Sequence, residues 1–236
     1  MDTHPSDRAE ERIAFLAGRY VSGGGDYLEQ AVYWPREGWS SHLKDAWDLP
    51  NPLSRGAVMG IAADARDEDN YDLAEKAFIA VMVWGFGSTG YGPHRVGEMR
   101  ASRPEGLGNY MLKVLNHANT GQSTAVYEFL QQRENRAKEL GPTYASKIAY
   151  FVTKGEESPI LDSEVAMWIW KQEGKWLFDP ARWSTERYSD FHEYCRCLLE
   201  VLADVVPSCP LTLGFVEYLM FVDRAAQSVP EWARTI

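Results

Sequence analysis

The sequence predicts an all-α protein, a bundle of roughly ten helices. Residues that begin and end helices recur along the whole chain, and apolar residues return every three or four positions between them. The alternation of apolar and polar residues that marks a half-buried strand is nearly absent. The chain also contains no internal repeat and no low-complexity tract. These observations favour packed helices over a fold built on a sheet.

Capping residues and breaks define the helices expected in the first part of the chain. Ser6 and Asp7 can cap a helix that carries apolar residues at 13, 16, 17 and 20 and ends at the glycines 23–25. Prolines end two further helices, and Asn70 caps a longer, more apolar one. The expected helices are 26–33, 37–47, one that begins at Ser54, and 70–82.

Residues 85–108 form the main irregular region, which glycine and proline interrupt repeatedly. Helices resume after it, and prolines separate the last two. The expected helices are 106–118, 123–140, 144–153, 163–172, 186–205 and 211–228, with a turn at 174–180 that can include a short strand at 175–178. We expect residues 1–236 to form one domain, and if it has two lobes, their seam lies near 85–108.

The composition is that of an ordinary globular protein. The 236 residues are 45% hydrophobic and 25% charged, which is enough to bury a sizeable core. The N-terminus lacks the basic and apolar parts of a signal peptide, and the longest apolar run, 77–84, is too short for a membrane span. Three cysteines are too few for a disulfide framework. We therefore expect a cytoplasmic protein with no membrane partner.

The charge is distributed unevenly along the chain. A net charge of −10 argues against a broad electrostatic grip on nucleic acid. Residues 61–75 carry six acidic residues and one basic residue, whereas residues 131–154 carry five basic and two acidic residues. A small basic area on an acidic protein fits contact with DNA over a small footprint.

Two patterns that can indicate a cofactor have better explanations here. Residues 85–90, Gly-Phe-Gly-Ser-Thr-Gly, match a dinucleotide-binding loop, but such a loop follows a strand and leads directly into a helix. Here a helix is expected before the loop, and Gly92-Pro93 interrupts the segment after it. The glycines more plausibly permit close approach of the backbone to another surface, such as a DNA phosphate. Cys195 and Cys197 lie about 200° apart around a helix and cannot hold one metal ion. We expect no metal and no cofactor.

The segment Leu140-Gly-Pro-Thr-Tyr-Ala-Ser-Lys-Ile-Ala-Tyr-Phe151 has the form of a helical hairpin. A long helix is expected to end at its start, and Gly141 and Pro142 make a tight turn. Glycine tolerates a positive φ, and proline fits the first turn of the next helix. The N–H groups at the start of that second helix, around Thr143 and Tyr144, point outward and suit a phosphate.

A second segment, Pro159-Ile-Leu-Asp-Ser-Glu-Val-Ala-Met-Trp168, comes after the hairpin and a short loop. Asp162 stands where a helix N-cap belongs, directly before an apolar run. Taken alone, Asp162 would be only a helix cap and Lys147 only a solvated lysine. The order of the two segments indicates more.

That order resembles the helix-hairpin-helix superfamily of DNA glycosylases, especially the 8-oxoguanine glycosylase-like branch found in bacteria and plants. In that superfamily a hairpin grips one DNA phosphate, and an aspartate then caps the next helix beside the flipped nucleotide. Residues 140–151 match the hairpin, and residues 160–165 match the aspartate segment. The resemblance implies a glycosylase-like bundle that binds double-stranded DNA through Gly141, Pro142, Thr143 and Tyr144, with Asp162 in the catalytic site.

The chain departs from the family pattern at two positions. Relatives with lyase activity usually carry a nucleophilic lysine where this chain has Thr143. Lys147 lies one turn further on the same helix face, about 6 Å along the axis, and can present its amine to the same cavity. The position two after the aspartate is often histidine, and here it is Glu164. The pocket can therefore recognise a different base.

The chemistry fits these residues. Breaking an N-glycosidic bond builds positive charge on the sugar, which the fixed carboxylate of Asp162 would stabilise. A partly desolvated Lys147 could attack C1′ and form a Schiff base, or it could hold a phosphate. The base must first leave the stack, and Trp84, Trp168 or Trp183 could hold it, although most of the nine tryptophans belong to the core.

Three functions are compatible with the sequence. The first is a glycosylase that removes an oxidised purine or a hypermodified phage pyrimidine, in base-excision repair or antiviral defence, with or without lyase activity at the abasic site. The second is a non-catalytic DNA-binding or damage-sensing module on the same scaffold. The third is a helical interaction protein without a role on DNA, for which the net charge is the best argument.

Overall fold

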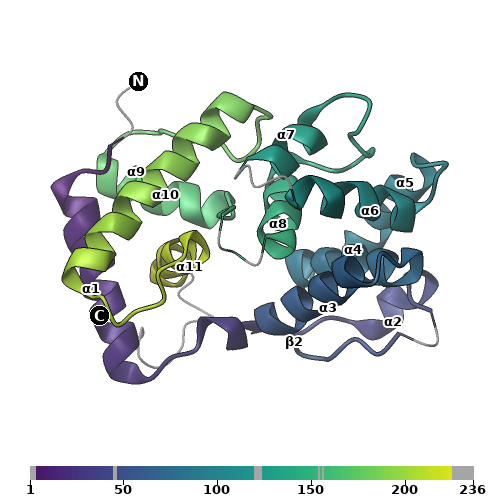
Figure 1. Ribbon diagram of the computed structural model, residues 1–236, viewed down its shortest axis with the longest axis horizontal. Coiled ribbons are helices and arrows are strands. Elements are labelled where there is room, and N and C mark those ends of the chain that lie inside the picture. The colour runs from purple at the N-terminus through teal and green to yellow at the C-terminus, as the bar shows by residue number, and fades with distance from the viewer. Residues whose placement is uncertain (1–3, 45–46, 120–123, 154, 156, 225–236) are drawn as a thin grey trace. The chain divides into compact units, whose positions relative to one another are not determined.

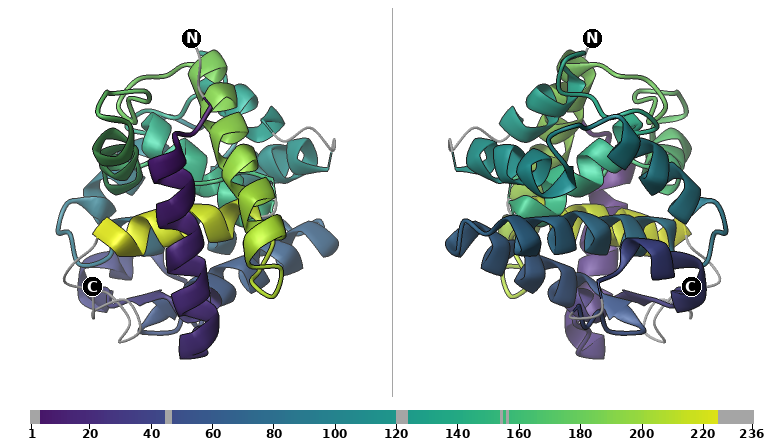
Figure 2. Two further views of the ribbon diagram at one scale, coloured as in Figure 1. Left: turned by 90° about the vertical axis from the view of Figure 1, so that its left-hand side faces the viewer. Right: turned by 90° about the vertical axis from the view of Figure 1, so that its right-hand side faces the viewer.

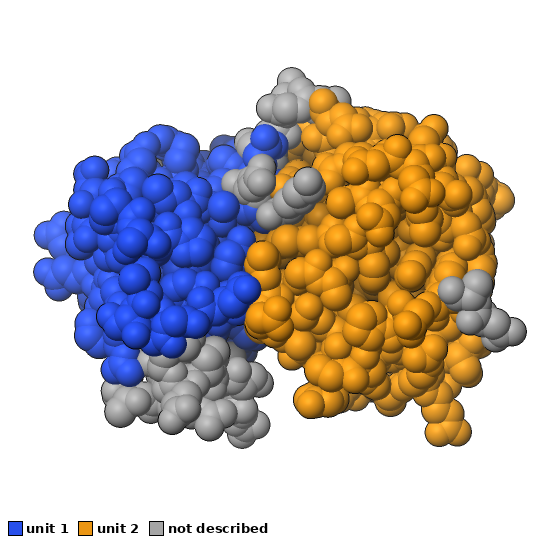
Figure 3. All heavy atoms as spheres, turned by 60° about the horizontal axis from the view of Figure 1, so that its bottom comes forward, with its two compact units in different colours: residues 1–27, 155–236 blue, residues 28–154 orange. Residues whose placement is uncertain are grey.

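The computed structural model describes residues 4–44, 47–119, 124–153, 155 and 157–224. Within these residues the chain forms eleven α-helices, two short 3-10 helices and one pair of two-residue strands (Figure 1). The prediction of an all-α bundle is therefore confirmed. The chain divides into two compact units: unit 1, residues 1–27 and 155–236, and unit 2, residues 28–154 (Figure 3). Residues 85–108 lie inside unit 2, and the prediction that they are mainly irregular is wrong: helix α5 (Gly92–Ala101) forms within them, because Gly92 and Pro93 begin this helix instead of interrupting the segment.

Unit 1 combines helices from both ends of the chain: α1 (Asp7–Gly23), α9 (Ser163–Glu173), α10 (Thr185–Val205) and α11 (Leu213–Arg224). Helices α1 and α10 lie side by side, and α11 packs against α1, α9 and α10 (Figure 2, left). The core lies along α11, because nine of its twelve residues are buried. There the rings of Phe215 and of Tyr20 from α1 pack edge to face, with their centroids 4.7 Å apart.

The predicted caps of unit 1 form as expected. The hydroxyl of Ser6 accepts a hydrogen bond from the backbone N–H of Ala9 and begins α1. Gly24 ends the same helix with a φ of +63°, which glycine adopts at little cost. The caps thus fix where α1 starts and stops, and the N–H and hydroxyl of Ser6 also donate to the Glu173 carboxylate of α9 at 3.1 and 3.2 Å.

Unit 2 contains the remaining elements: β1 (Ala31–Val32), α2 (Arg36–Trp39), η2 (Ser40–His42), β2 (Leu53–Ser54), α3 (Arg55–Asp67), α4 (Tyr71–Phe86), α5 (Gly92–Ala101), α6 (Leu107–Ala118), α7 (Ala125–Gln131) and α8 (Pro142–Val152). Helix α4 is apolar on nearly every side and packs against α3, α5, α6 and α8. A helix with this pattern belongs in the interior. Helix α8 is also central, since its last eight residues are all buried.

Some predicted elements differ from those observed. Residues 26–33 form η1 (Tyr27–Glu29) and strand β1, which pairs antiparallel with β2. Of the helix expected at 37–47, only α2 and η2 form, and residues 45–46 lie outside the described residues. No strand forms at 175–178. The last helix is described only to Arg224, so residues 225–228 of that prediction also lie outside.

The largest error concerns the helix expected at 123–140. Residue 123 lies outside the described residues, and α7 ends at Gln131. Residues 132–141, here called the connector, then run through turns to α8. The sequence between 132 and 140 is polar and lacks a helix breaker before Gly141, so its pattern did not reveal the early end of the helix. Hydrogen bonds between the connector and the two residues that follow α5, Ser102 and Arg103, replace the expected helical bonds.

Candidate functional site

The start of α8 has the geometry that suits a helix N-terminal site. Gly141 is the N-cap, with extended backbone angles of −87° and 167°, and Pro142 is the first helical residue. The left-handed turn expected at Gly141 falls instead at Glu139, which has a φ of +64°. A Cβ atom at Gly141 would meet no atom within 4 Å, so the space beside Gly141 is open. Gly141, Pro142, Thr143 and Tyr144 are all half-buried at this end of α8.

The last turns of α5 and the two residues after it hold the connector that leads to this end. The guanidinium of Arg103 donates to the backbone carbonyls of Glu134, at 2.9 Å, and Asn135. The backbone N–H of Lys138 donates to Ser102 Oγ at 3.0 Å, and its ammonium donates to Glu98 at 2.5 Å. This ion pair lowers the pKa of the Glu98 carboxyl and raises that of the Lys138 amine. The connector is therefore tied down by side chains rather than by helical hydrogen bonds.

Lys147 lies one turn into α8 and is only 8% exposed. Lysine is rarely buried to this extent, because removing an ammonium group from water costs free energy that a partner must offset. Its Nζ lies 5.2 Å from the ring centroid of Trp84 in α4, within the range of a cation–π interaction. The ammonium group is thus positioned by an aromatic ring in the interior of unit 2.

Trp84 is itself buried and contacts a second cation. The guanidinium of Arg55, the first residue of α3, lies 5.1 Å from the Trp84 ring and 5.0 Å from the Tyr150 ring. Arg55 is fully buried, and its Nε donates to the side-chain oxygen of Gln30. Arg55 is not recognisable as a site residue from the sequence, because an arginine after the cap Ser54 looks like an ordinary first-turn residue. Nothing in the local pattern indicates that it turns inward.

Gly85, near the end of α4, allows α4 to lie close to α8. A Cβ atom at Gly85 would lie 3.0 Å from Tyr144 and 3.2 Å from the Lys147 side chain. The next ring along, Phe86, stacks on Tyr144 at 4.2 Å. Helix α4 extends to Phe86, so the preceding segment is a helix and not the strand that a dinucleotide site needs. Gly85 therefore permits a close approach within unit 2, directly beside the residues at the start of α8.

In unit 1, Asp162 is the N-cap of α9, as predicted. Its Oδ1 accepts hydrogen bonds from the backbone N–H groups of Glu164 at 3.0 Å and Val165 at 3.1 Å. Asp162 is 9% exposed, so its carboxylate is held in a largely dry position by the helix it caps. Asp162 belongs to unit 1 and Lys147 to unit 2.

Two sets of contacts fix the helix that carries Asp162. The hydroxyl of Tyr188 donates to the carbonyl of Pro159 at 2.8 Å and anchors the loop that enters α9. Further along, the indole N–H of Trp168 donates to Asp223 at 2.8 Å, and Arg12 of α1 donates to the same carboxylate at 3.0 Å. Trp168 is fully buried and belongs to the core, so it is not available to hold a base.

Glu164, the residue two after Asp162, lies in the first turn of α9 and forms an ion pair with Arg224 of α11. Its Oε2 lies 3.8 Å from Nε of Arg224 at the end of α11. The side chains are 42% and 33% exposed, so the pair is open to solvent and adds little stability. An acid with an arginine beside it therefore occupies the place of the family's usual histidine.

Other groups that could mark a metal or redox site are packed into the fold. The thiol of Cys195 is buried, and burial raises its pKa well above the ordinary value. Among the described residues, no three histidine, cysteine or acidic side chains gather as a metal site requires. Within the same ranges, no helix is both long and apolar enough to cross a membrane.

Comparison with known proteins gives one informative result. The model of a protein family described as "putative 8-oxoguanine DNA glycosylase OGG-like protein" matches residues 25–221. This match includes α8, Asp162 and most of both units. No curated protein and no solved structure matches the chain.

Proposed function

Because the chain belongs to the family of 8-oxoguanine DNA glycosylase OGG-like proteins, we propose that it is a DNA glycosylase. It flips a modified base out of double-stranded DNA and breaks the N-glycosidic bond, which leaves an abasic site. The reaction needs a fixed negative charge near the sugar and a nucleophile at C1′. The chain supplies candidates for both roles.

The observation that carries this proposal is that the Asp162 carboxylate is both fixed by hydrogen bonds and buried. A carboxylate that caps a helix and is nearly excluded from water is already oriented before substrate arrives. A preorganised charge of this kind stabilises the developing oxocarbenium ion more than the ground state, because the charge develops only as the bond breaks. We assign Asp162 this role.

Lys147 is the second proposed catalytic residue. Its burial and its contact with Trp84 support a positioned amine rather than a mobile surface cation. As a nucleophile, its neutral amine would attack C1′ while the base departs with the bonding electron pair. The nitrogen would then lose a proton and the C1′–O4′ bond would break with a proton added to O4′, which gives the Schiff base that lyase activity requires. If water is the nucleophile instead, Lys147 would hold the adjacent phosphate.

The start of α8 is the proposed DNA contact. The backbone N–H groups of Gly141 and Thr143 would bind one phosphate, supported by the open space beside Gly141 and by the positive end of the helix dipole. Pro142 has no N–H group, and that of Tyr144 already donates to the carbonyl of Gly141 at 3.1 Å. The loop after α4 would lie near the same DNA segment, because Phe86 stacks directly on Tyr144. This arrangement needs few basic residues, which is compatible with a net charge of −10.

The substrate is proposed to be an oxidised purine or a hypermodified phage pyrimidine. The family resemblance favours the first, which would place the protein in base-excision repair. Glu164 with Arg224, in place of a histidine, favours a base other than 8-oxoguanine and thus a role in antiviral defence.

A panel of duplexes, each with one modified base, tests this proposal, with alkaline cleavage of abasic sites as the readout. We expect one duplex to be cleaved by the parent protein, and Asp162→Asn to lose this activity. Borohydride then separates the two roles of Lys147: a covalent adduct that is present in the parent and absent in Lys147→Ala and Lys147→Met identifies the nucleophile. Binding to DNA without base release on any duplex would indicate a non-catalytic module instead.

A further inference from the structure

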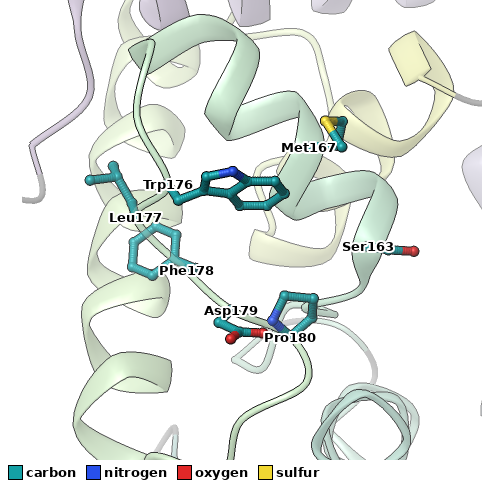
Figure 4. A pocket seen from close by; sticks show the side chains of 7 residues that line it. All are labelled: Ser163, Met167, Trp176, Leu177, Phe178, Asp179 and Pro180. Atoms are coloured by element: carbon teal, nitrogen blue, oxygen red, sulfur yellow. The ribbon is translucent and has the colours of Figure 1, made fainter.

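Two adjoining cavities lie in unit 1 beside the helix that Asp162 caps. The first has a volume of about 420 Å³ and is lined by Ser163 and Met167 of α9 and by residues 176–180 (Figure 4). The second, of about 330 Å³, shares part of that lining and continues to Arg187 in the first turn of α10. Ser163 directly follows Asp162, so the lining of the first cavity includes the residue next to the proposed catalytic residue in the chain.

The first cavity offers a flat aromatic surface. Trp176 is 57% exposed, and its ring stacks on that of Trp170, which is 42% exposed, with centroids 6.1 Å apart. Met167, Phe178 and Pro180 complete an apolar lining around the indole (Figure 4). Two large exposed rings side by side are costly on a protein surface unless a ligand covers them, and a planar ligand is the natural match.

The second cavity adds two arginines to this surface, each paired with a carboxylate: Arg182 with Asp179, and Arg187 with Asp190 at 3.4 Å. Its lining contains Arg182, Arg187 and Trp183, with Asp179 as its acidic residue. Asp179 also fixes the loop, because its carboxylate accepts the backbone N–H of Ala181 at 2.9 Å and Nε of Arg182 at 3.1 Å. A preformed aromatic cavity beside arginines, on a chain with a net charge of −10, fits a ligand that joins a flat ring to an anion.

We propose that these cavities bind an unstacked nucleotide of the DNA strand that carries the target base. The base would stack on Trp176 in the first cavity, and its phosphate would contact Arg182 and Arg187 in the second. This proposal rests on the proposed function, since a DNA glycosylase brings a locally distorted strand to Asp162. The contact would keep that strand open beside the reacting nucleotide and would not depend on the identity of the excised base.

The direct test is photochemical cross-linking with short single-stranded oligonucleotides that carry one 5-iodouracil, followed by peptide mapping. We expect the cross-link in the peptide that contains Trp176. In duplexes, moving the 5-iodouracil from the target position to each neighbouring position then shows which nucleotide occupies the cavity. A cross-link confined to other peptides at every position would overturn the proposal.

Affinity for the same oligonucleotides provides the second test. Loss of one stacked base should weaken binding of Trp176→Ala by between about five-fold and 150-fold, whereas Trp176→Phe should retain most of it. Phe15→Ala removes another exposed ring of unit 1, 48% exposed, outside these cavities, and should bind like the parent.

The two arginines are tested by the salt dependence of binding. In a plot of the logarithm of the binding constant against the logarithm of the salt concentration, Arg182→Ala and Arg187→Ala should each make the slope shallower by about 0.7. Thermal melting of each variant shows whether it is folded.

The outcomes separate this inference from the proposed function. Parental affinity in a folded Trp176→Ala, together with base release from a modified duplex, would refute the inference and leave the function intact. Weakened binding of Trp176→Ala without base release on any duplex would support the cavities and refute the glycosylase. A chain that binds no DNA in any assay would refute both.

Discussion

Lys147 and Trp84 form a cation–π pair inside unit 2, with Nζ 5.2 Å from the ring centroid and both residues more than nine-tenths buried. The pair joins α8 to α4 at the point where Gly85 lets the two helices approach. A flexible lysine side chain thereby loses much of its freedom. Such preorganisation is what a nucleophile needs, because the entropy of its orientation has already been lost.

Trp84→Leu should therefore impair the reaction of Lys147 more than it impairs DNA binding. Holding a lysine side chain in one orientation removes up to about 2 kcal/mol of rotamer entropy, so without the ring the rate of borohydride-trapped adduct formation should fall by up to about thirty-fold. Trp84→Phe keeps an aromatic face and should recover most of the rate. Single-turnover trapping at saturating protein measures the effect, and an unchanged rate in Trp84→Leu would show that the ring does not position the amine.

Gly141 allows a test of the phosphate contact that leaves the fold alone. Its angles are open to any residue, and a side chain there meets empty space. Gly141→Asp and Gly141→Ser are both good N-caps, so the free energy of unfolding should stay at the parental value or rise slightly. Only the aspartate places a negative charge where the phosphate would bind. We expect about ten-fold or greater loss of DNA affinity for Gly141→Asp.

The control for this prediction is Gly108, where a Cβ atom would lie 2.5 Å from the carbonyl oxygen of Tyr71. Gly108→Ala should lower the free energy of unfolding by about 1–3 kcal/mol, because a backbone atom cannot easily move away. Chemical denaturation measures both positions. Equal affinities of Gly141→Asp and Gly141→Ser for DNA would remove the start of α8 from the binding surface.

Two histidines make stability depend on pH. Burial lowers the pKa of His42, with the cation Arg100 adding to the effect, and burial also lowers the pKa of His192. Below the ordinary value of 6.5 the unfolded chain takes up protons that the folded chain resists, so the free energy of unfolding falls as the pH drops. Urea denaturation at pH 7.5 and 5.5 should show this loss. A His42→Gln/His192→Gln double variant should show a smaller one, and an equal loss would assign the effect to other groups.

The sequence predicted the parts of the fold that local chemistry controls. Asn70 and Asp162 cap helices as expected, because an N-cap depends only on the cap residue and the next two or three N–H groups. The helix expected to reach residue 140 ends at Gln131 because Arg103 and Ser102, thirty or more positions earlier in the chain, bind the connector. Contacts of that range leave no periodic signal in the connector itself.

The candidate site divides in the same way. Gly141, Pro142 and Asp162 were predicted from turn and cap chemistry, and the structure places them at the starts of α8 and α9. The inward turn of Arg55 and its contact with Trp84 depend on how α3, α4 and α8 pack. Trp84 was one of three tryptophans that could have held the base, but it is 6% exposed and contacts two cations instead.

Activity should not require a metal ion. Cys195 is buried within α10, and Cys197 lies about 200° around that helix, so the two cannot coordinate the same ion. Base release should proceed at the parental rate after exhaustive dialysis against EDTA. Loss of activity that zinc or iron restores would show that the chain holds a metal through other residues.

Substitutions of Asp162 separate its structural role from its proposed catalytic role. Asparagine caps a helix about as well as aspartate does, so Asp162→Asn should keep the bonds to Glu164 and Val165 while it loses the charge. Alanine loses both the capping bonds and the charge, and Asp162→Ala should lower the free energy of unfolding by about 1 kcal/mol.

The rate of base release tests the catalytic role of Asp162. If the carboxylate stabilises the oxocarbenium ion, both variants should release the base about 100-fold to 1,000-fold more slowly than the parent. If Asp162 were only a cap, Asp162→Asn would work at the parental rate and Asp162→Ala would fail only as far as it unfolds. Single-turnover base release, measured beside chemical denaturation of the same samples, decides between the two, and a parental rate in Asp162→Asn would overturn the assignment of the site.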